Sequence, residues 1–188
     1  ADGNIKMLQY KDMGLVQEVF NDFVLNELSG QAAVGHVRYG TTGASSRESA
    51  QPLVSRYLKG SFALAHNGNL VNVEAMREEL QAQGAIFQST NDSEIVAHLM
   101  AKERINTAST AEAMLKVMKE IKGAYSLVIL TPKRLIAVRD PQGFKPMCIG
   151  KLKNSYVFAS ETCALDSIGA DYVREVEPGE VVVVDKEG

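Results

Sequence analysis

The feature that most constrains this chain is an apolar run that stops at an Asn-Gly pair. Residues 61–65 (SFALA) have the composition of a buried strand, and His66, Asn67 and Gly68 follow directly. Asn-Gly is the strongest short turn signal, so the sequence predicts that the strand ends there in a tight turn. Such a turn exposes the Gly68 N–H beside the Asn67 side-chain amide, and two fixed donors aimed at one point suit a tetrahedral oxyanion. The alternative is an ordinary hairpin turn.

Composition narrows the kinds of protein that this chain can be. Its 188 residues are one domain in size, and its apolar content of 45% is typical of a globular protein. A net charge of −3 leaves no broad basic surface, so we expect no nucleic-acid partner. No apolar run approaches the length that crosses a membrane, and two cysteines suit a reducing compartment. We therefore expect a cytoplasmic protein with no membrane contact.

The two cysteines give no sign of a metal site. Cys148 lies in the apolar run MCI and is expected to be a buried structural thiol. Cys163 lies near an expected helix start, where a lowered thiol pKa and plain packing are alternatives. No pair of Cys or His residues has the spacing of metal ligands, so the sequence predicts neither a metal nor another cofactor in this chain.

Hydrophobic periodicity predicts a chain of mixed helices and strands. Helices are expected at residues 16–28, 73–83, 91–101 and 110–121. Strands are expected at residues 5–10, 32–39, 61–65, 125–130, 135–139, 147–149, 156–159, 172–176 and 181–185. Because most helices are grouped in the middle of the chain, the pattern favours α+β layers over a βαβ repeat.

Three blocks of the sequence together resemble a known kind of glutamine site. They are residues 35–41 (GHVRYGT), 66–70 (HNGNL) and 89–94 (STNDSE). Arg, Asn-Gly and Asp in this order resemble the class II glutamine amidotransferases, which are N-terminal-nucleophile (Ntn) glutaminases. The related glucosamine-6-phosphate synthase glutaminases share these blocks.

Three later blocks narrow the resemblance to one branch of the family. Residues 140–146 (DPQGFKP), 159–166 (ASETCALD) and 174–180 (REVEPGE) resemble glutamine phosphoribosylpyrophosphate amidotransferases. The resemblance implies a four-layer αββα sandwich in which two antiparallel sheets lie between helices. With these blocks it extends over nearly the whole chain.

The resemblance also implies a nucleophile that the chain does not contain. In this family it is a cysteine whose own free α-amino group is the base, so it must be the first residue of the mature enzyme. This chain begins with Ala1, and its opening segment resembles the second or third strand of the family. We therefore expect residues 1–188 to be a partial type 2 amidotransferase domain. It would lack its N-terminal strands, its nucleophile and a C-terminal phosphoribosyltransferase domain, and by itself it would be inactive.

The resemblance assigns roles to five residues. Arg38 suits the α-carboxylate of glutamine, because a guanidinium forks onto two oxygens. Asp92 suits the α-ammonium group, and Asn67 with the Gly68 N–H suits the oxyanion. Thr41 falls where the family's loop closes over the substrate. Taken singly, Arg38 has the alternative of a strand-end salt bridge, and Asp92 has the alternative of a helix N-cap.

The three histidines are expected to support the structure, since the Ntn mechanism takes its base from the α-amine. His66 is expected to orient the Asn-Gly pair through hydrogen bonds, and His36 to support the site from the strand that carries Arg38. His98 is expected to be a core or boundary residue of its helix. Residues 40–49 are rich in small residues, and we expect this loop to act as a lid over the substrate, with an ordinary surface loop as the alternative.

The implied function is that of a glutaminase serving a second active site. Glutamine would be hydrolysed to glutamate and ammonia, which would replace pyrophosphate on phosphoribosyl pyrophosphate in the first committed step of purine synthesis. The partners would be glutamine and the phosphoribosyltransferase domain, for which Mg²⁺ is expected, and the parent protein would be a homo-oligomer. The alternative from another class is a non-catalytic Ntn-like module that binds an amino acid or a partner protein.

Overall fold

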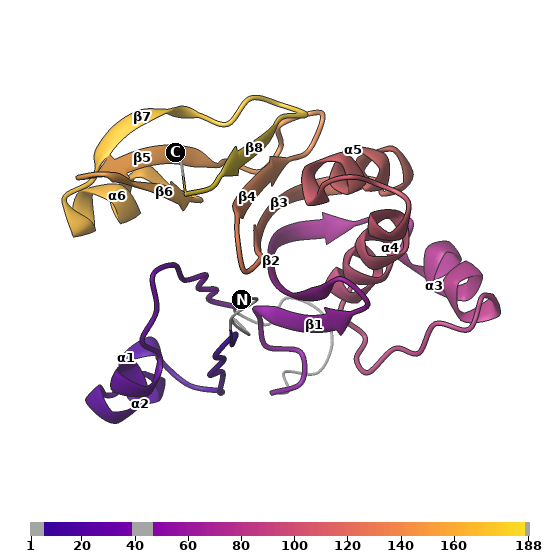
Figure 1. The fold of residues 1–188 in the computed structure, drawn as a ribbon, viewed down its shortest axis with the longest axis horizontal. Coiled ribbons are helices and arrows are strands. Elements are labelled where there is room, and N and C mark those ends of the chain that lie inside the picture. Colours follow the sequence, from indigo (N-terminus) through magenta and orange to yellow (C-terminus); the bar gives the residue numbers. More distant parts are fainter. Residues whose placement is uncertain (1–5, 39–46, 187–188) are drawn as a thin grey trace.

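The computed structural model describes residues 6–38 and 47–186, and within them two antiparallel sheets organise the chain (Figure 1). The large sheet has the strand order β1-β2-β3-β4-β8, and the small sheet has the order β6-β5-β7. The strands of the large sheet are β1 (Leu53–Tyr57), β2 (Gly60–Leu70), β3 (Gly123–Leu130), β4 (Leu135–Arg139) and β8 (Val181–Val184). Those of the small sheet are β5 (Cys148–Leu152), β6 (Ser155–Ala159) and β7 (Asp171–Glu175).

Three clusters of buried side chains show how these layers stack. The largest lies between one face of the large sheet and the helices α3 (Val73–Ala82), α4 (Ser93–Ile105) and α5 (Thr110–Glu120). A second cluster, which includes Ala137 and Ile149, lies between the two sheets. The third packs Leu165 of α6 (Thr162–Ile168) against the outer face of the small sheet. The order helices, sheet, sheet, helix confirms the predicted αββα sandwich.

The N-terminal segment departs from its predicted structure. The expected helix at residues 16–28 is two short helices, α1 (Val16–Val19) and α2 (Asp22–Glu27), which lie apart from both sheets in Figure 1. The break occurs because Asn21 is extended and its side-chain oxygen accepts the N–H of Val24, at 3.1 Å. An Asn within a helical pattern can begin a new helix in this way, and the single-helix prediction is therefore wrong.

The two strands expected before residue 40 are also not formed within the described residues. Residues 6–10 and 32–38 have no strand assignment, although residue 5 and residue 39 of the predicted strands lie outside the described residues. A strand requires a neighbouring backbone for its hydrogen bonds. Side chains make the contacts instead: Gln9 Nε2 donates to Pro52 O, just before β1, at 2.6 Å, and His36 Nε2 lies 3.0 Å from His66 O in β2. The sequence prediction also missed a strand, because β1 forms where none was expected.

The predicted turn at Asn67-Gly68 is wrong, because β2 continues through it to Leu70. Residues 63–70 of β2 pair with residues 123–130 of β3 without interruption. Gly68 has a φ of +144°, and a Cβ atom there would lie 2.0 Å from Ala124 O. Gly123 has a φ of +141° and faces Asn69 O in the same way. Long-range pairing of two glycine-containing backbones thus overrides the local turn preference.

This close approach predicts a specific cost for adding a methyl group to Gly68. Gly68→Ala should lower the free energy of unfolding by at least about 1–3 kcal/mol more than Gly60→Ala. Both glycines lie in β2 with positive φ, but a Cβ at Gly60 meets nothing within 4 Å. Urea unfolding of the two variants in the full-length protein measures the difference, and equal losses would contradict the close approach.

Candidate active site

The candidate site lies where β2 extends beyond the end of its neighbour β1. β1 pairs with residues 60–64 of β2, so residues 65–70 present an edge that β1 does not cover. We call residues 65–70 the open edge. Side chains take the place of a strand there: Gln51 Oε1 accepts the His66 N–H at 2.7 Å, and His36 Nε2 lies 3.0 Å from His66 O. Further along, Asp92 Oδ2 accepts the Leu70 N–H at 3.0 Å.

The orientation of Gly68 follows from the alternation of hydrogen bonds along a strand. The N–H and C=O of Tyr125, the residue opposite Gly68, face Asp140 on the other side of β3. Gly68 and Tyr125 are therefore a non-hydrogen-bonded pair, in which both backbones turn outward. Gly68 lies between His66 and Leu70, whose N–H groups also face outward. The Gly68 N–H thus points to the open edge, between the groups that hold His66 and the carboxylate of Asp92.

The side chain of Asn67 lies on the opposite face of β2 from the helices. Leu64 and Leu70 pack into the helix-side core, so Asn67, at odd spacing, faces the side of the small sheet. It is half-buried and stands opposite Ser126 of β3. The amide of Asn67 and the N–H of Gly68 therefore come from adjacent residues of a fixed strand, which is a more rigid support than the turn that the sequence predicted.

A buried histidine joins the open edge to the start of α4. His66 is only 3% exposed, and its Nδ1 lies 3.4 Å from Asp92 Oδ1 and 3.2 Å from Ser93 Oγ. Burial alone would raise the pKa of Asp92, but the hydrogen bonds from His66 and from the Leu70 N–H outweigh it and hold that pKa below its usual value. Asp92 is therefore an anion at neutral pH, with part of its carboxylate still exposed to solvent.

The capping alternative for Asp92 is not what the structure shows. Asp92 occupies the N-cap position of α4, but its side chain makes no capping hydrogen bond. Instead Asn91 Oδ1 accepts the Ser93 N–H at 3.0 Å. The Asp92 carboxylate instead binds the Leu70 N–H at the end of β2. No signal in the sequence indicated this contact, because the two residues are 22 positions apart.

The loop before α4 is fixed by residues that the sequence reading did not single out. Arg77 donates to the carbonyls of Ser89 and Asn91, at 3.0 and 3.2 Å. Glu94 accepts the N–H groups of Gln88 and Ser89, at 3.1 and 3.0 Å. His98, which the sequence did single out as a core or boundary residue, is half-buried, and its ring lies 4.7 Å from that of Phe87. These contacts hold Asp92 in place without entering the site.

His36 and Arg38 approach the open edge from the N-terminal segment. Burial lowers the pKa of His36, and the nearby charge of Arg38 lowers it further, against the effect of the hydrogen bond with His66 O. Arg38 itself is exposed. Thr41 and most of the expected lid lie outside the described residues, so the lid stays a prediction. The structure thus gathers His36, His66, Asn67, Gly68 and Asp92 at one edge, with Arg38 two residues from His36.

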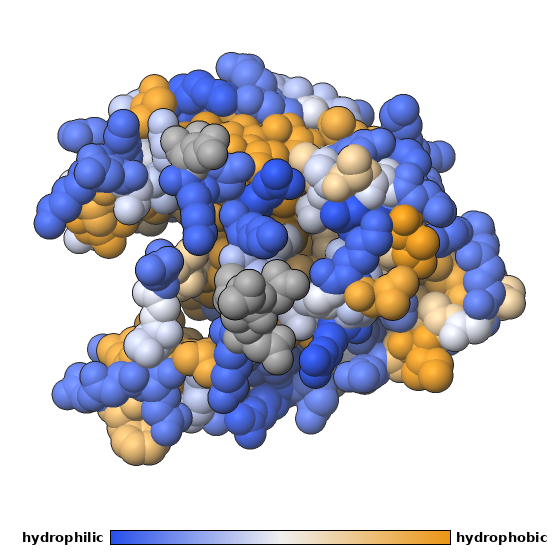
Figure 2. Space-filling view, viewed as in Figure 1, coloured by the Kyte–Doolittle hydropathy of each residue, from blue (hydrophilic) through white to orange (hydrophobic). Residues whose placement is uncertain are grey.

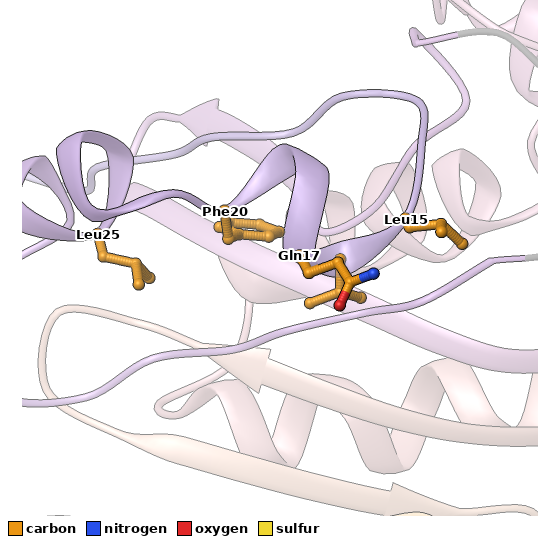
Figure 3. Close-up of a pocket in the computed structure, with 5 residues that line it drawn as sticks. Leu15, Gln17, Phe20 and Leu25 are labelled. Atoms are coloured by element: carbon orange, nitrogen blue, oxygen red, sulfur yellow. The ribbon is translucent and has the colours of Figure 1, made fainter.

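The cysteines and a hollow in the N-terminal segment lie away from the open edge. Cys148 is buried in β5, where its Sγ lies 3.4 Å from Ala159 O, and Cys163 is exposed at the start of α6. A hollow of about 620 Å³ lies between α1 and α2, lined by Leu15, Val16, Gln17, Phe20 and Leu25 (Figure 3). None of these five residues has an ionisable side chain. Figure 2 shows apolar and hydrophilic residues mixed on this N-terminal segment, across an open notch from the small sheet.

Comparison with known proteins places the chain in a family. Residues 36–167, more than half of the chain, match the family model described as a glutamine amidotransferase domain. The chain belongs to the glutamine amidotransferase family. This confirms the resemblance read from the sequence, and the matched region contains Arg38, Asn67, Gly68 and Asp92.

The relatives found by sequence and by structure agree. The chain is 45% identical to amidophosphoribosyltransferase of Methanocaldococcus jannaschii, over 93% of this chain and 37% of that protein. It is 44% identical to the Bacillus subtilis protein of the same name, over 100% of this chain and 39% of that protein. A solved structure of glutamine phosphoribosylpyrophosphate amidotransferase from B. subtilis, complexed with ADP and GMP, superposes with a TM-score of 0.86. It covers 93% of this chain and 37% of that one, at 44% identity.

A second solved structure, that of the allosteric regulatory enzyme of purine biosynthesis, superposes with a TM-score of 0.88 over 93% of this chain and 37% of that one. This amidotransferase domain thus spans less than two fifths of the length of the relatives that it matches. Among the described residues, no helix is both long and apolar enough to cross a membrane.

The lowered pKa of His36 predicts how stability changes with pH. Below the usual histidine value of 6.5 the unfolded chain takes up a proton that folded His36 resists, so stability is lost as the pH falls from there toward the folded pKa. His36→Gln removes this loss while keeping a side-chain donor for His66 O. The variant should melt below wild type at about pH 8, and the gap should shrink or reverse by about pH 5.5. Thermal unfolding at both values checks this, and a constant gap would contradict it.

Proposed function

We propose that this domain hydrolyses glutamine to glutamate and ammonia, and that the ammonia is transferred to phosphoribosyl pyrophosphate elsewhere in the same protein. One observation carries the proposal: the Gly68 N–H points out of a rigid strand edge, with Asn67 beside it and the Asp92 carboxylate at the end of the same strand. The match of residues 36–167 to an amidotransferase domain supports it. So do the amidophosphoribosyltransferases that are 44–45% identical, although they extend well beyond this domain.

The chemistry divides into attack on the amide and release of the acid. A cysteine thiolate attacks the side-chain amide carbon of glutamine, and the amide oxygen becomes an oxyanion that Asn67 and the Gly68 N–H stabilise. The α-amino group of that cysteine, which has taken up the thiol proton, passes the proton to the leaving nitrogen as the carbon–nitrogen bond breaks, so ammonia leaves and a thioester remains. Water hydrolyses the thioester to glutamate and restores the thiolate. Cys148 and Cys163 lie in the layer of the small sheet and α6, so neither suits this nucleophile.

The remaining residues bind the amino-acid end of the substrate. Arg38 pairs with the α-carboxylate of glutamine through its planar fork. Asp92 pairs with the α-ammonium group. Its two oxygens already accept hydrogen bonds from the Leu70 N–H and His66, but a carboxylate has about four acceptor positions, so capacity remains. His66 and His36 position these groups and take no part in proton transfer.

The oxyanion role of Asn67 predicts a kinetic signature. In the full-length protein, Asn67→Ala should lower kcat for glutamine, because charge develops on the amide oxygen only in the transition state. The loss of one such donor typically costs on the order of 3 kcal/mol, or roughly a hundredfold in rate. Steady-state glutamate release measures it. An unchanged kcat with a raised KM would instead assign Asn67 to ground-state binding, and wild-type protein without glutaminase activity would contradict the proposed function.

The binding role of Arg38 predicts the opposite pattern. Arg38→Lys keeps the charge but loses the bidentate fork, and a charge-assisted hydrogen bond is worth about 1.5–3 kcal/mol. KM for glutamine should therefore rise roughly ten- to a hundredfold, with a smaller effect on kcat. The reaction that uses added ammonia in place of glutamine is the control and should not change. Equal loss of both reactions would show that Arg38 acts on the fold and not on the substrate.

A further inference from the structure

A buried carboxylate holds the strand behind the proposed oxyanion donors. Asp140 follows β4 and is fully buried. Its Oδ1 accepts the N–H groups of Gln142 and Phe144, at 3.0 and 3.3 Å. Its Oδ2 accepts the N–H groups of Tyr125 and Lys145, at 3.4 and 3.3 Å. Four backbone amides thus compensate the burial of one charge, because an unpaired buried carboxylate is strongly unfavourable.

These bonds tie the loop of residues 140–146 to the start of β3. Tyr125 uses both backbone groups on Asp140: its carbonyl accepts the Asp140 N–H at 2.9 Å, and its N–H donates to the carboxylate. Ser126 Oγ donates to the carbonyls of Lys145 and Pro146, at 3.3 and 3.2 Å. The loop therefore fixes two consecutive residues of β3.

Those two residues stand directly behind the oxyanion donors. In the register of the large sheet, Tyr125 lies opposite Gly68, and Ser126 lies opposite Asn67. The backbones approach so closely at Gly68 that a Cβ there would lie 2.8 Å from the Cα of Tyr125. Because the two backbones are in such close contact, a displacement of β3 also displaces Gly68 and its N–H.

The loop is itself clamped by a neighbouring guanidinium. Arg139 donates to the carbonyls of Lys145, Gly143 and Val176, at 2.8, 3.0 and 2.6 Å, and pairs with Glu175 at 3.1 Å. These bonds go to the loop, to Glu175 at the end of β7 and to Val176 just after it. The Asp140 carboxylate is bound by the four backbone N–H groups named above. So many buried hydrogen bonds around one short loop constrain its position more tightly than chain connectivity would.

We propose that Asp140 is a positioning residue for the oxyanion donors Asn67 and Gly68, acting through Tyr125 and Ser126. This inference rests on the proposed glutaminase function and adds a residue that touches neither substrate nor nucleophile. A displacement of about 1 Å at a reacting centre is enough to lower a rate by roughly a hundredfold. Asp140 keeps the two donors in register with the open edge.

The test replaces Asp140 by asparagine in the full-length protein. Asn has one acceptor oxygen, so in either orientation its NH₂ group faces two of the four N–H groups that the carboxylate accepts. We expect kcat for glutamine to fall about ten- to a hundredfold. KM for glutamine should stay within about twofold, because Arg38 and Asp92 lie outside β3 and Asp92 is also held by its place at the start of α4. Activity with added ammonia should be unchanged.

Two further variants separate positioning from loss of stability. Leu165→Ala opens a cavity between α6 and the small sheet, far from β2, and should lower the melting temperature without lowering kcat. Ser126→Ala removes the bond from β3 to Lys145 O and Pro146 O without leaving a buried N–H unpaired, and should lower kcat by a smaller factor than Asp140→Asn. It also decides the matter if Asp140→Asn does not fold.

Each outcome bears on the inference in one direction. A selective loss of kcat in Asp140→Asn, with Leu165→Ala at wild-type kcat, supports the positioning role; if Asp140→Asn does not fold, the same loss in Ser126→Ala supports it. Wild-type kcat in Asp140→Asn (or in Ser126→Ala where Asp140→Asn does not fold), or an equal loss of the glutamine and ammonia reactions, overturns it. Wild-type protein that lacks glutaminase activity overturns the proposed function itself, and is a separate result from a variant that retains kcat.

Discussion

The pairing of β2 with β3 is the contact on which the candidate site depends. Gly68 and Gly123 allow the two backbones to approach to a distance that no side chain permits, and this fixes which way each peptide group turns. Hydrogen bonds alternate along an antiparallel pair. The register that pairs Asn67 with Ser126 of β3 therefore leaves the Gly68 N–H pointing away from β3. The positions of Asn67 and of the Gly68 N–H, the proposed oxyanion donors, are therefore set by sheet geometry and not by a flexible turn.

A second constraint is electrostatic and lies at the open edge. His66 is buried between β2 and α4, with Asp92 and Ser93 on one side and its carbonyl held by His36. The Asp92 carboxylate binds both the Leu70 N–H at the end of β2 and His66, so these two contacts set its position relative to Gly68. A charge held in this way is arranged before the substrate arrives, which lowers the reorganisation that binding requires.

Elements with strong periodicity could be predicted from the sequence, and those that depend on distant partners could not. The helices at residues 73–83 and 110–121 match α3 and α5 to within a residue or two. The strand at 135–139 matches β4 at both ends. By contrast, the helix at 16–28 is divided by the cap at Asn21, and the segments before residue 40 have no strand pairing within the described residues. Periodicity reports which side chains face a core, but it does not report whether a second backbone is present.

The sequence by itself determined the family, because the blocks that carry Arg38, Asn67-Gly68 and Asp92 resemble those of the glutamine amidotransferases in residue type and order, and the match of residues 36–167 confirms the resemblance. Only the tertiary structure decided that Asn67 and Gly68 lie within a strand, that Asp92 binds Leu70 instead of capping α4, and that Asp140 supports β3. The physical reason is that side-chain chemistry can be read one residue at a time. The direction in which a backbone N–H points depends on its neighbour across the sheet, which here is more than fifty residues away along the chain.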